Sequence, residues 1–325
     1  MLRILHNTKY DFIRHWRLTT GLIAAFIVPA LVWIAVQGFN YSIEFTGGTL
    51  MQVEFRQAPD MGKLRSVLTD AGISNLEIQT FGRPEEIVLR GQEESHVEQQ
   101  EEGAEAIVTT IRGALDREYG RDAYNVVRTE AVGPKVGSEL RTNAVIALLI
   151  SFAITLVYLA WRFEWRFAVA ALVATIHDII ATVAFMRYAN VEVSLFVVGA
   201  ILTVVGYSLN DTIVVFDRVR ENLKAAGRDK SESFVALLNR SVNETLPRTV
   251  MTGTTTLATL IALFIFGGEV IRPFAVVLIF GILVGTFSSV FVASPVLLWI
   301  ERRWPAANVT RATRVTAAEP RRRPA

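Results

Sequence analysis

The chain has 325 residues, of which 51% are hydrophobic, and its formal net charge is only +2. Soluble domains of this length rarely carry so much apolar sequence, so the composition indicates a membrane protein rather than a soluble enzyme. The chain contains no cysteine, which excludes disulfides and thiol chemistry. It also lacks a GxxxxGK(S/T) phosphate-binding loop. Any work that the protein does must therefore draw on an ion gradient or on a partner.

Six apolar segments are long enough to span a bilayer, which takes about 17–25 residues. The first is too long for the core of a signal peptide and lacks a convincing cleavage site, so we expect an uncleaved anchor. Basic residues gather before the first span, between the second and third, between the fourth and fifth, and after the sixth, which predicts cytoplasmic termini. The predicted spans are Leu18–Gly38, Asn143–Trp161, Phe167–Arg187, Val193–Phe216, Val250–Phe266 and Phe274–Trp299.

The spans divide the chain into four predicted parts. They are a cytoplasmic N-terminus with the first span (1–38), an outer, periplasmic domain (39–139), five further spans (140–300) with a cytoplasmic loop at 217–247, and a basic cytoplasmic tail (301–325). The outer domain holds 10 basic and 18 acidic residues, the sign expected outside the membrane. A basic tail is also typical of nucleic-acid binding, but cytoplasmic flanks of spans are usually basic, so we expect no nucleic acid.

The outer domain is predicted to be α+β. Its single histidine, His96, lies among glutamates, where a solvated surface is expected in preference to a metal site. Tight turns are expected at Gly47-Gly48, after the first span, and at Gly133-Pro134, before the second. The predicted order is βαββαβ, a ferredoxin-like arrangement. The elements are strands at Ile43–Phe55, Leu76–Phe81, Ile87–Leu89 and Ala123–Val132, and helices at Pro59–Ala71 and Ser95–Tyr119.

The most informative residue is Asp211, an ionisable side chain within the fourth span. A carboxylate in the middle of a bilayer costs about 2.5–3.5 kcal/mol on insertion scales, so such residues usually serve ion transport, ligand binding or a buried ion pair. Arg248, at the start of the fifth span, is the obvious partner. Two alternatives stay open: Arg248 extends to the membrane interface, and Asp211 forms a static hydrogen bond only.

Three spans carry polar stripes at helical spacing, which membrane helices usually turn towards one another. Within the third span, both a transport role and a structural role are open for Asp178. Its neighbour His177 is a candidate for titration in the physiological range or for a hydrogen bond between helices. The stripes are Thr203, Tyr207, Asn210 and Asp211 on the fourth span, Arg248, Thr252, Thr255 and Thr259 on the fifth, and Thr175, Asp178 and Thr182 on the third.

These stripes predict a proton switch. Burial favours the neutral carboxyl of Asp211, whereas a nearby guanidinium favours the carboxylate. Movement of Arg248 towards or away from Asp211 would therefore release or bind a proton, although an aspartate among hydroxyls also suits Na⁺. We expect no metal centre and no cofactor. The predicted pathway residues are Asp211, Arg248, Asp178, His177, Asn210, Thr252 and Thr255.

Five motifs together resemble the SecF family of protein-translocation factors, a branch of the resistance–nodulation–division superfamily. They are SIEFTGGT after the first span, VGPKVGSEL before the second, the His-Asp pair in the third, GYSLNDTIVVFDRVREN in the fourth and LPRTVMTGTTTL at the fifth. Each motif is weak alone, but all five occur in order, and the similarity covers nearly the whole chain.

The resemblance implies a bacterial inner-membrane protein that is half of a transporter-like complex. SecD would supply six more spans, and Asp211 and Arg248 would lie in a proton path. The complex would use the proton-motive force to assist export of unfolded preproteins through the SecYEG channel, with YajC and YidC as further candidate partners. The alternatives are a proton-coupled exporter of small molecules or lipids from the same superfamily, and a membrane scaffold that transports nothing.

Overall fold

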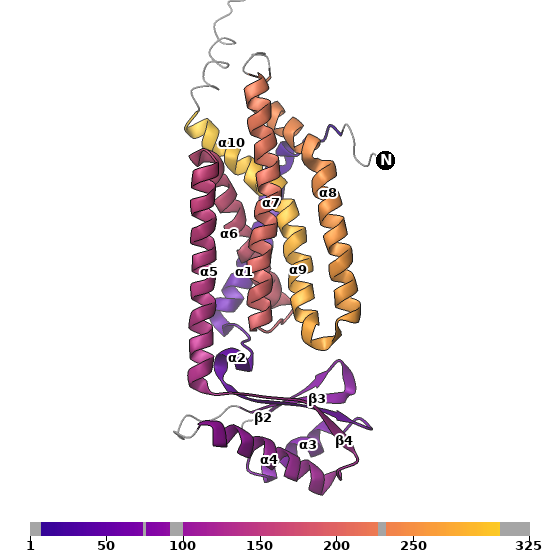
Figure 1. Cartoon of the computed structure of the whole chain (residues 1–325). Helices are drawn as coiled ribbons and strands as arrows, with labels where there is room; N and C mark the ends of the chain where they lie inside the picture. The colour runs from indigo at the N-terminus through magenta and orange to yellow at the C-terminus, as the bar shows by residue number, and fades with distance from the viewer. Residues whose placement is uncertain (1–7, 74–75, 92–99, 227–231, 306–325) are drawn as a thin grey trace, which may run out of the picture. The chain divides into compact units, whose positions relative to one another are not determined.

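The computed structural model describes residues 8–73, 76–91, 100–226 and 232–305. The chain forms two compact units, drawn in Figure 1. The membrane unit comprises Met1–Gly38, Ile150–Val191 and Gly199–Ala325, and the sheet unit comprises Phe39–Leu149 and Glu192–Val198.

Six helices in the described ranges are long and apolar enough to cross a membrane, which confirms the six predicted spans. The sixth is not one regular α-helix, because a π-helical turn, η2, joins α9 to α10. There the Ser294 hydroxyl donates to the carbonyl of Ser289, five residues earlier. The helices are α1 (Trp16–Gln37), α5 (Pro134–Arg162), α6 (Trp165–Tyr188), α7 (Leu195–Ala226), α8 (Phe234–Phe266), α9 (Gly268–Ser288), η2 (Ser289–Ala293) and α10 (Ser294–Arg303).

Two of these helices begin well before the apolar segments from which the spans were predicted. Helix α5 begins at Pro134, where a missing N–H costs nothing. Helix α8 begins after Ser233, whose hydroxyl accepts the Ala236 N–H at 3.2 Å. Most of the described part of the predicted connection 217–247 between the fourth and fifth spans is therefore helical. Hydropathy detects only the stretch that can lie in lipid, whereas capping and helix propensity set where the helix begins.

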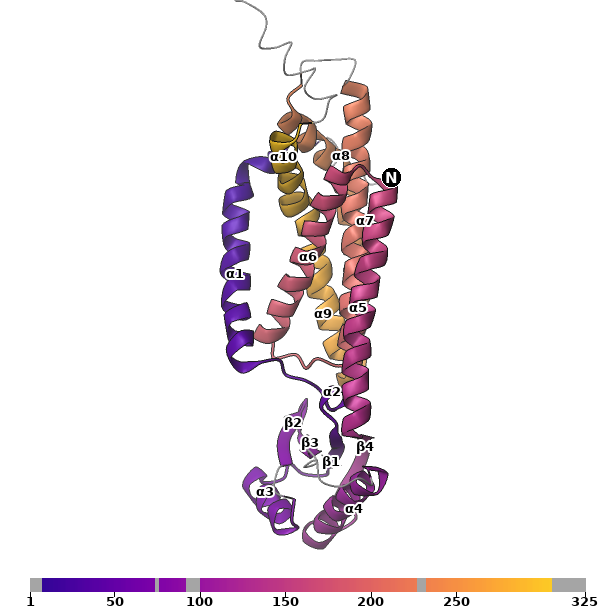
Figure 2. The same cartoon turned by 90° about the vertical axis from the view of Figure 1, so that its left-hand side faces the viewer.

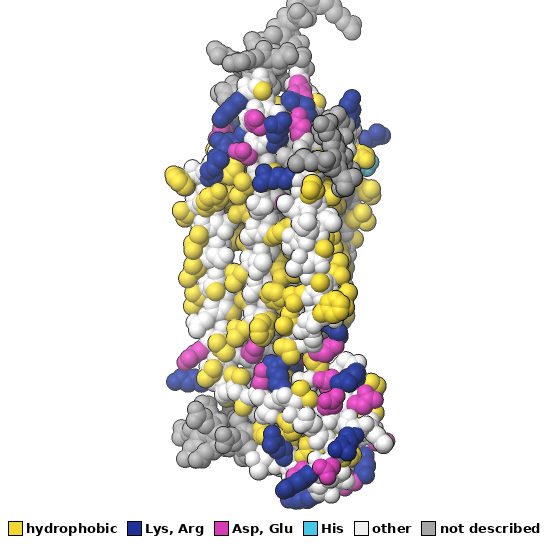
Figure 3. Space-filling view, turned by 45° about the vertical axis from the view of Figure 1, so that its right-hand side comes forward, with side chains coloured by type: hydrophobic (Ala, Val, Ile, Leu, Met, Phe, Trp, Pro, Cys, Tyr) yellow, Lys and Arg dark blue, Asp and Glu magenta, His cyan; other side chains and the backbone are white. Residues whose placement is uncertain are grey.

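The helices of the membrane unit differ strongly in burial. Large hydrophobic side chains of α1 and α5 are widely exposed, and Figure 3 shows such side chains over the outer surface, with charged residues beyond them. Helices α6 and α7 instead contribute to a buried core with α8 and α10. An apolar outer surface of this extent suits lipid rather than water. The core includes Phe167, Phe216, Leu238 and Leu297.

Small residues on α9 allow a close approach of α7. A Cβ at Gly285 would lie 2.8 Å from the Cβ of Ser208, and one at Gly281 would overlap Val204. Gly199 and Gly206 of α7 differ from them, because within the described part of the chain no neighbouring atom lies within 4 Å of a Cβ at either position. Of these four glycines, the two on α9, at small-xxx-small spacing, therefore allow the close approach to α7.

Replacing Gly285 with Ala should destabilise the membrane unit by about 1–3 kcal/mol, the usual cost of overpacking. The new methyl group would press on Ser208, a residue of the neighbouring helix, at 2.8 Å. Gly206→Ala is the matched control, because it adds the same methyl in open space and gains helix propensity. Thermal unfolding in detergent should show a lower midpoint for Gly285→Ala only, and equal midpoints would contradict the close approach.

The sheet unit contains the predicted outer domain. Its four strands form one antiparallel sheet in the order β2-β3-β1-β4, and α3 and α4 cover one face of it (Figures 1 and 2). The core lies between them and includes Met51, Ile87 and Leu89 from the sheet, Leu68 from α3 and Leu115 from α4. The βαββαβ order agrees with the predicted ferredoxin-like domain. The elements are β1 (Gly48–Phe55), α3 (Met61–Asp70), β2 (Leu76–Phe81), β3 (Arg83–Gly91), α4 (Gln100–Glu118) and β4 (Tyr124–Val132).

Two strand boundaries differ from the prediction. Ile43–Thr46 is not strand but a short helix, α2, because the Thr46 N–H and hydroxyl both donate to the Ser42 carbonyl and Gly47 then turns the chain. Strand β3 (Arg83–Gly91) is longer than Ile87–Leu89, and its residues from Glu86 to Gly91, after Pro84, pair with Glu54 to Thr49 of β1. Pro84 lacks an N–H, so it is tolerated outside that ladder. His96 lies outside the described residues.

Candidate functional site

The centre of the membrane unit is a fully buried carboxyl group, that of Asp178 on α6. His177 Nδ1 lies 2.8 Å from its Oδ1. Its Oδ2 accepts hydrogen bonds from the hydroxyls of Ser208 on α7 and of Ser288 on α9, the latter at 2.7 Å. Asp178 therefore joins three membrane helices, and both of its oxygens have partners. The Nε2 atom of His177 is buried, and it has no partner among the residues that the structure describes.

The second buried carboxyl is Asp211 on α7, which is 2% exposed. Its Oδ2 accepts a hydrogen bond from the Thr286 hydroxyl of α9 at 3.1 Å. Helix α8 passes close by, because a Cβ at Gly253 would lie 3.6 Å from the Thr286 oxygen. Asp211 thus has fewer hydrogen-bond partners than Asp178, which leaves it better suited to bind and release a cation.

Arg248 is an exposed residue within α8 rather than at its start. No ion pair within 4.0 Å joins it to Asp211 in the described ranges. The predicted pair is therefore open in this conformation. Next to these residues, Thr212 and Thr249 each have a buried hydroxyl that finds no hydrogen-bond partner in the part of the chain that the structure describes.

The other predicted pathway residues are not gathered around Asp211. Asn210 and Thr255 are exposed, and Thr252 is half-buried. The hydroxyls of Thr252 and Thr255 donate to backbone carbonyls one turn earlier, at 3.0 Å each. The expectation that these stripes turn inward is therefore wrong for Asn210 and Thr255 in the chain alone, and threonine hydroxyls can be satisfied by their own helix. One contact does join the two helices here, from the Tyr207 hydroxyl of the α7 stripe to Thr256, a neighbour of the α8 stripe, at 3.4 Å.

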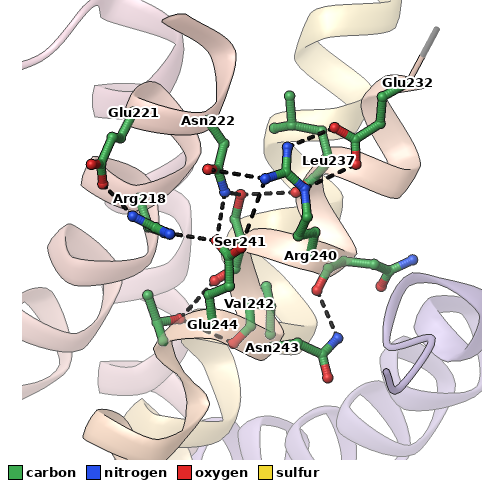
Figure 4. A network of polar contacts seen from close by, with 12 residues as sticks. Arg218, Glu221, Asn222, Glu232, Leu237, Arg240, Ser241, Val242, Asn243 and Glu244 are labelled. Carbon is green, nitrogen blue, oxygen red and sulfur yellow. Dashed lines mark hydrogen bonds and ion pairs between the residues drawn. The ribbon is translucent and has the colours of Figure 1, made fainter. Parts of the chain in front are cut away.

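A polar network ties α7 to α8 beyond Asp211 and Arg248 (Figure 4). Arg218 donates to Glu244 at 2.7 Å, and the buried Asn222 donates to Glu244 at 2.8 Å and to Ser241 at 2.9 Å. Arg240 donates to Asn222 at 3.2 Å and also pairs with Glu232. The sequence prediction missed this network because it treated these residues as a loop. A loop-side connection of this kind limits how far the two helices can separate.

The two predicted glycine turns meet in the sheet unit. Gly47 and Gly48 have φ values of 75° and 126°, in the region that favours glycine. A Cβ at Gly47 would lie 2.8 Å from Pro134 Cα, and a Cβ at Gly137 would lie 2.9 Å from the Gly47 nitrogen. The turn after α2 is therefore packed directly against the first turn of α5, and only glycine fits there.

Sequence reasoning also missed Ser208, Ser288 and Thr286, whose hydroxyls contact the two buried carboxyls. A signal was present in the run Thr286-Phe-Ser-Ser289, since hydroxyl residues are adjacent to one another inside an otherwise apolar span. The prediction considered polar stripes on three spans only and left the sixth without a role.

Two family models match the chain. The model "Protein export membrane protein SecD/SecF, C-terminal" covers residues 113–303, which include the helices that carry both buried carboxyls. The model "SecD/SecF GG Motif" covers residues 32–59, which include the turn at Gly47 and Gly48.

Curated relatives and solved structures agree with these models. The chain is 54% identical to the protein translocase subunit SecF of Gemmatimonas aurantiaca over 98% of this chain and 95% of the relative. It is 42% identical to that of Desulfurispirillum indicum over 91% and 94%.

The crystal structure of SecDF from Thermus thermophilus matches with a TM-score of 0.80 and 34% identity, over 93% of this chain. SecDF in a super-membrane-facing form matches with a TM-score of 0.66 and 34% identity, over 96%. This chain spans 40% of each of those two chains. The chain therefore belongs to the SecF family of protein translocase subunits.

Proposed function

We propose that this chain is the SecF half of a SecDF complex in the bacterial inner membrane. The complex would use the proton-motive force to assist export of unfolded preproteins through the SecYEG channel. The observation that carries the proposal is Asp211, a carboxyl that is 2% exposed inside a membrane-length helix. A group so costly to bury is expected to bind and release an ion rather than to fill space.

A SecD subunit would complete the complex. The chain spans only 40% of the matched SecDF chain, so the remainder of that architecture would come from a second polypeptide. The polar face with Asn210 on α7 and Thr255 on α8 is exposed. Lipid cannot satisfy an asparagine amide, whereas a neighbouring set of membrane helices can. YajC and YidC are further candidate partners of the assembled complex.

In the proposed cycle, Arg248 approaches Asp211 as a proton leaves and withdraws as a proton binds. Asp178 with His177 forms a second proton-binding site. Asn210, Thr252 and Thr255 line the proton pathway at the interface with SecD. Proton flow would change the orientation of the outer domain, and the outer domain would bind and release an extended polypeptide. The cycle needs no bond chemistry, metal or cofactor.

The gradient dependence can be tested with inverted vesicles that contain the full complex, the channel and a preprotein. We expect the stimulation of export to disappear when a protonophore collapses the proton gradient, and to persist when a sodium ionophore collapses the sodium gradient. The opposite pattern would identify Na⁺ as the coupling ion. Stimulation that survives both treatments would contradict an ion-driven role and favour the scaffold, for which the fully hydrogen-bonded Asp178 is suitable.

The proposed orientation places both termini in the cytoplasm and the outer domain in the periplasm. Because the chain lacks cysteine, single introduced cysteines can report this directly. In right-side-out vesicles, a membrane-impermeant maleimide should label Arg121→Cys, at a side chain that is 88% exposed. It should label Arg303→Cys in the cytoplasmic tail only after the vesicles are opened. The reverse pattern would overturn the orientation.

A further inference from the structure

Two helices have residues in both compact units. Residues 134–149 of α5 and 195–198 of α7 belong to the sheet unit, and the remainder of each helix belongs to the membrane unit. Of these two, α7 also carries Asp211, sixteen residues after its first residue, Leu195. At about 1.5 Å per residue, this is a helical distance of roughly 24 Å. Any displacement of α7 at the carboxyl is therefore expected at Leu195 as well.

The residue that leads into α7 is held by an ion pair within the sheet unit. Arg90 Nη2 of β3 donates to both carboxylate oxygens of Glu192, at 2.7 Å each. The Arg90 side chain is 11% exposed, and Glu77 of the neighbouring strand β2 is a second, longer partner at 3.7 Å. A guanidinium that is this well buried depends on its carboxylates, so removing Glu192 leaves it with the longer contact to Glu77 and without its two 2.7 Å hydrogen bonds.

The first turn of α7 has a second attachment, to the segment that precedes the glycine turn. The Glu44 carboxylate accepts the Leu195 N–H at 2.6 Å, where the positive end of the helix dipole favours an anion. Beside it, the Ser42 N–H donates to the Val193 carbonyl at 3.0 Å, and the Val193 N–H donates to the Asn40 carbonyl at 2.7 Å. Side-chain and backbone contacts thus fix the start of α7 to the outer domain and its connecting segment.

We propose that Arg90, Glu192 and Glu44 are positioning residues that transmit the movement of α7 to the outer domain. This inference rests on the proposed function, because it assumes that ion binding at Asp211 displaces α7. In this assignment the three residues act through α7 rather than on the ion itself. Their loss should uncouple the two events: ions still pass through the complex, but export no longer follows.

The test uses the full complex in vesicles, with two readouts, gradient-dependent export and proton entry during export. The near-isosteric change Glu192→Gln should lower gradient-dependent export at least about fivefold while proton entry persists. The exchange Arg90→Glu with Glu192→Arg should restore most of the gradient-dependent export, provided that Glu77→Gln is made with it, because a carboxylate at position 90 would otherwise face that of Glu77. The matched control is Arg83→Gln, which breaks the Arg83–Glu54 pair on the same sheet, at 2.6 Å but with side chains 65% and 39% exposed. That variant should export like the parent.

Several outcomes separate this inference from the proposed function. One outcome would overturn the inference alone: the variant Glu192→Gln exports normally, while the separate variant Asp211→Asn loses its gradient dependence. Loss of proton entry together with export in Glu192→Gln would also overturn it, because that pattern indicates a damaged ion path. If Glu192→Gln does not accumulate, the charge-exchange variant decides: a folded exchange variant that remains inactive contradicts the inference. Gradient dependence that survives Asp211→Asn would instead remove the proposed function.

Discussion

Replacing Asp211 with Asn should reduce export in the presence of a proton gradient to the rate measured without one. Asparagine has nearly the same shape, and its oxygen can still accept the Thr286 hydrogen bond that Asp211 accepts at 3.1 Å. The amide cannot bind or release a proton, so the switch is lost although the packing is kept. Assembly with the partner subunit should be unchanged, as measured by co-purification.

The control for this change lies on the same helix. Asp217 has a side chain that is 59% exposed, and it contacts Arg162 at 3.6 Å. Exposed ion pairs contribute about 0–1 kcal/mol, so Asp217→Asn should have little effect on either export or assembly. If Asp211→Asn keeps full gradient-dependent export, the buried carboxyl has only a structural role, and a scaffold becomes the better description.

The second large effect is expected at Gly47. This residue has φ 75° and ψ 165°, a conformation that costs other residues about 1–3 kcal/mol. In Gly47→Ala, the new methyl carbon would also lie 2.8 Å from Pro134 Cα and 3.0 Å from the Pro134 nitrogen. Backbone atoms cannot turn aside as a flexible side chain can. The combined cost is a large share of the roughly 5–15 kcal/mol by which folded proteins are stable, so the variant should accumulate poorly.

Gly38 provides a matched control for the backbone strain. It has a similar conformation, φ 73° and ψ −169°. Among the described residues, however, no atom lies within 4 Å of a Cβ built there. Gly38→Ala should therefore lower the unfolding midpoint through strain alone, and the additional loss in Gly47→Ala measures the clash with α5. Equal losses in the two variants would show that the close approach to Pro134 is unimportant.

The outer domain was predicted well because its signals are local. Alternation in the strands and helical spacing between them gave the βαββαβ order, which the antiparallel sheet β2-β3-β1-β4 matches. The error at Ile43–Thr46 has a physical cause. Its alternation suits a strand, but hydrogen bonds to Ser42 and the conformation of Gly47 close a helical turn instead. Local propensity is a weak determinant where a glycine turn and close packing act together.

The sequence by itself determined the six spans and the presence of carboxyls within them, because the transfer of a segment into lipid depends on its own composition. The tertiary structure alone decided which side chains meet. In it, the Thr286 hydroxyl donates a hydrogen bond to Asp211, and the hydroxyls of Ser208 and Ser288 donate to Asp178. Arg248 forms no ion pair with Asp211 among the described residues. Hydropathy contains no information on how each helix is rotated about its axis or which helices are neighbours. The rotation and the neighbours of each helix follow from packing, such as the contact of Gly285 of α9 with Ser208 of α7. They become fixed only when the helices assemble.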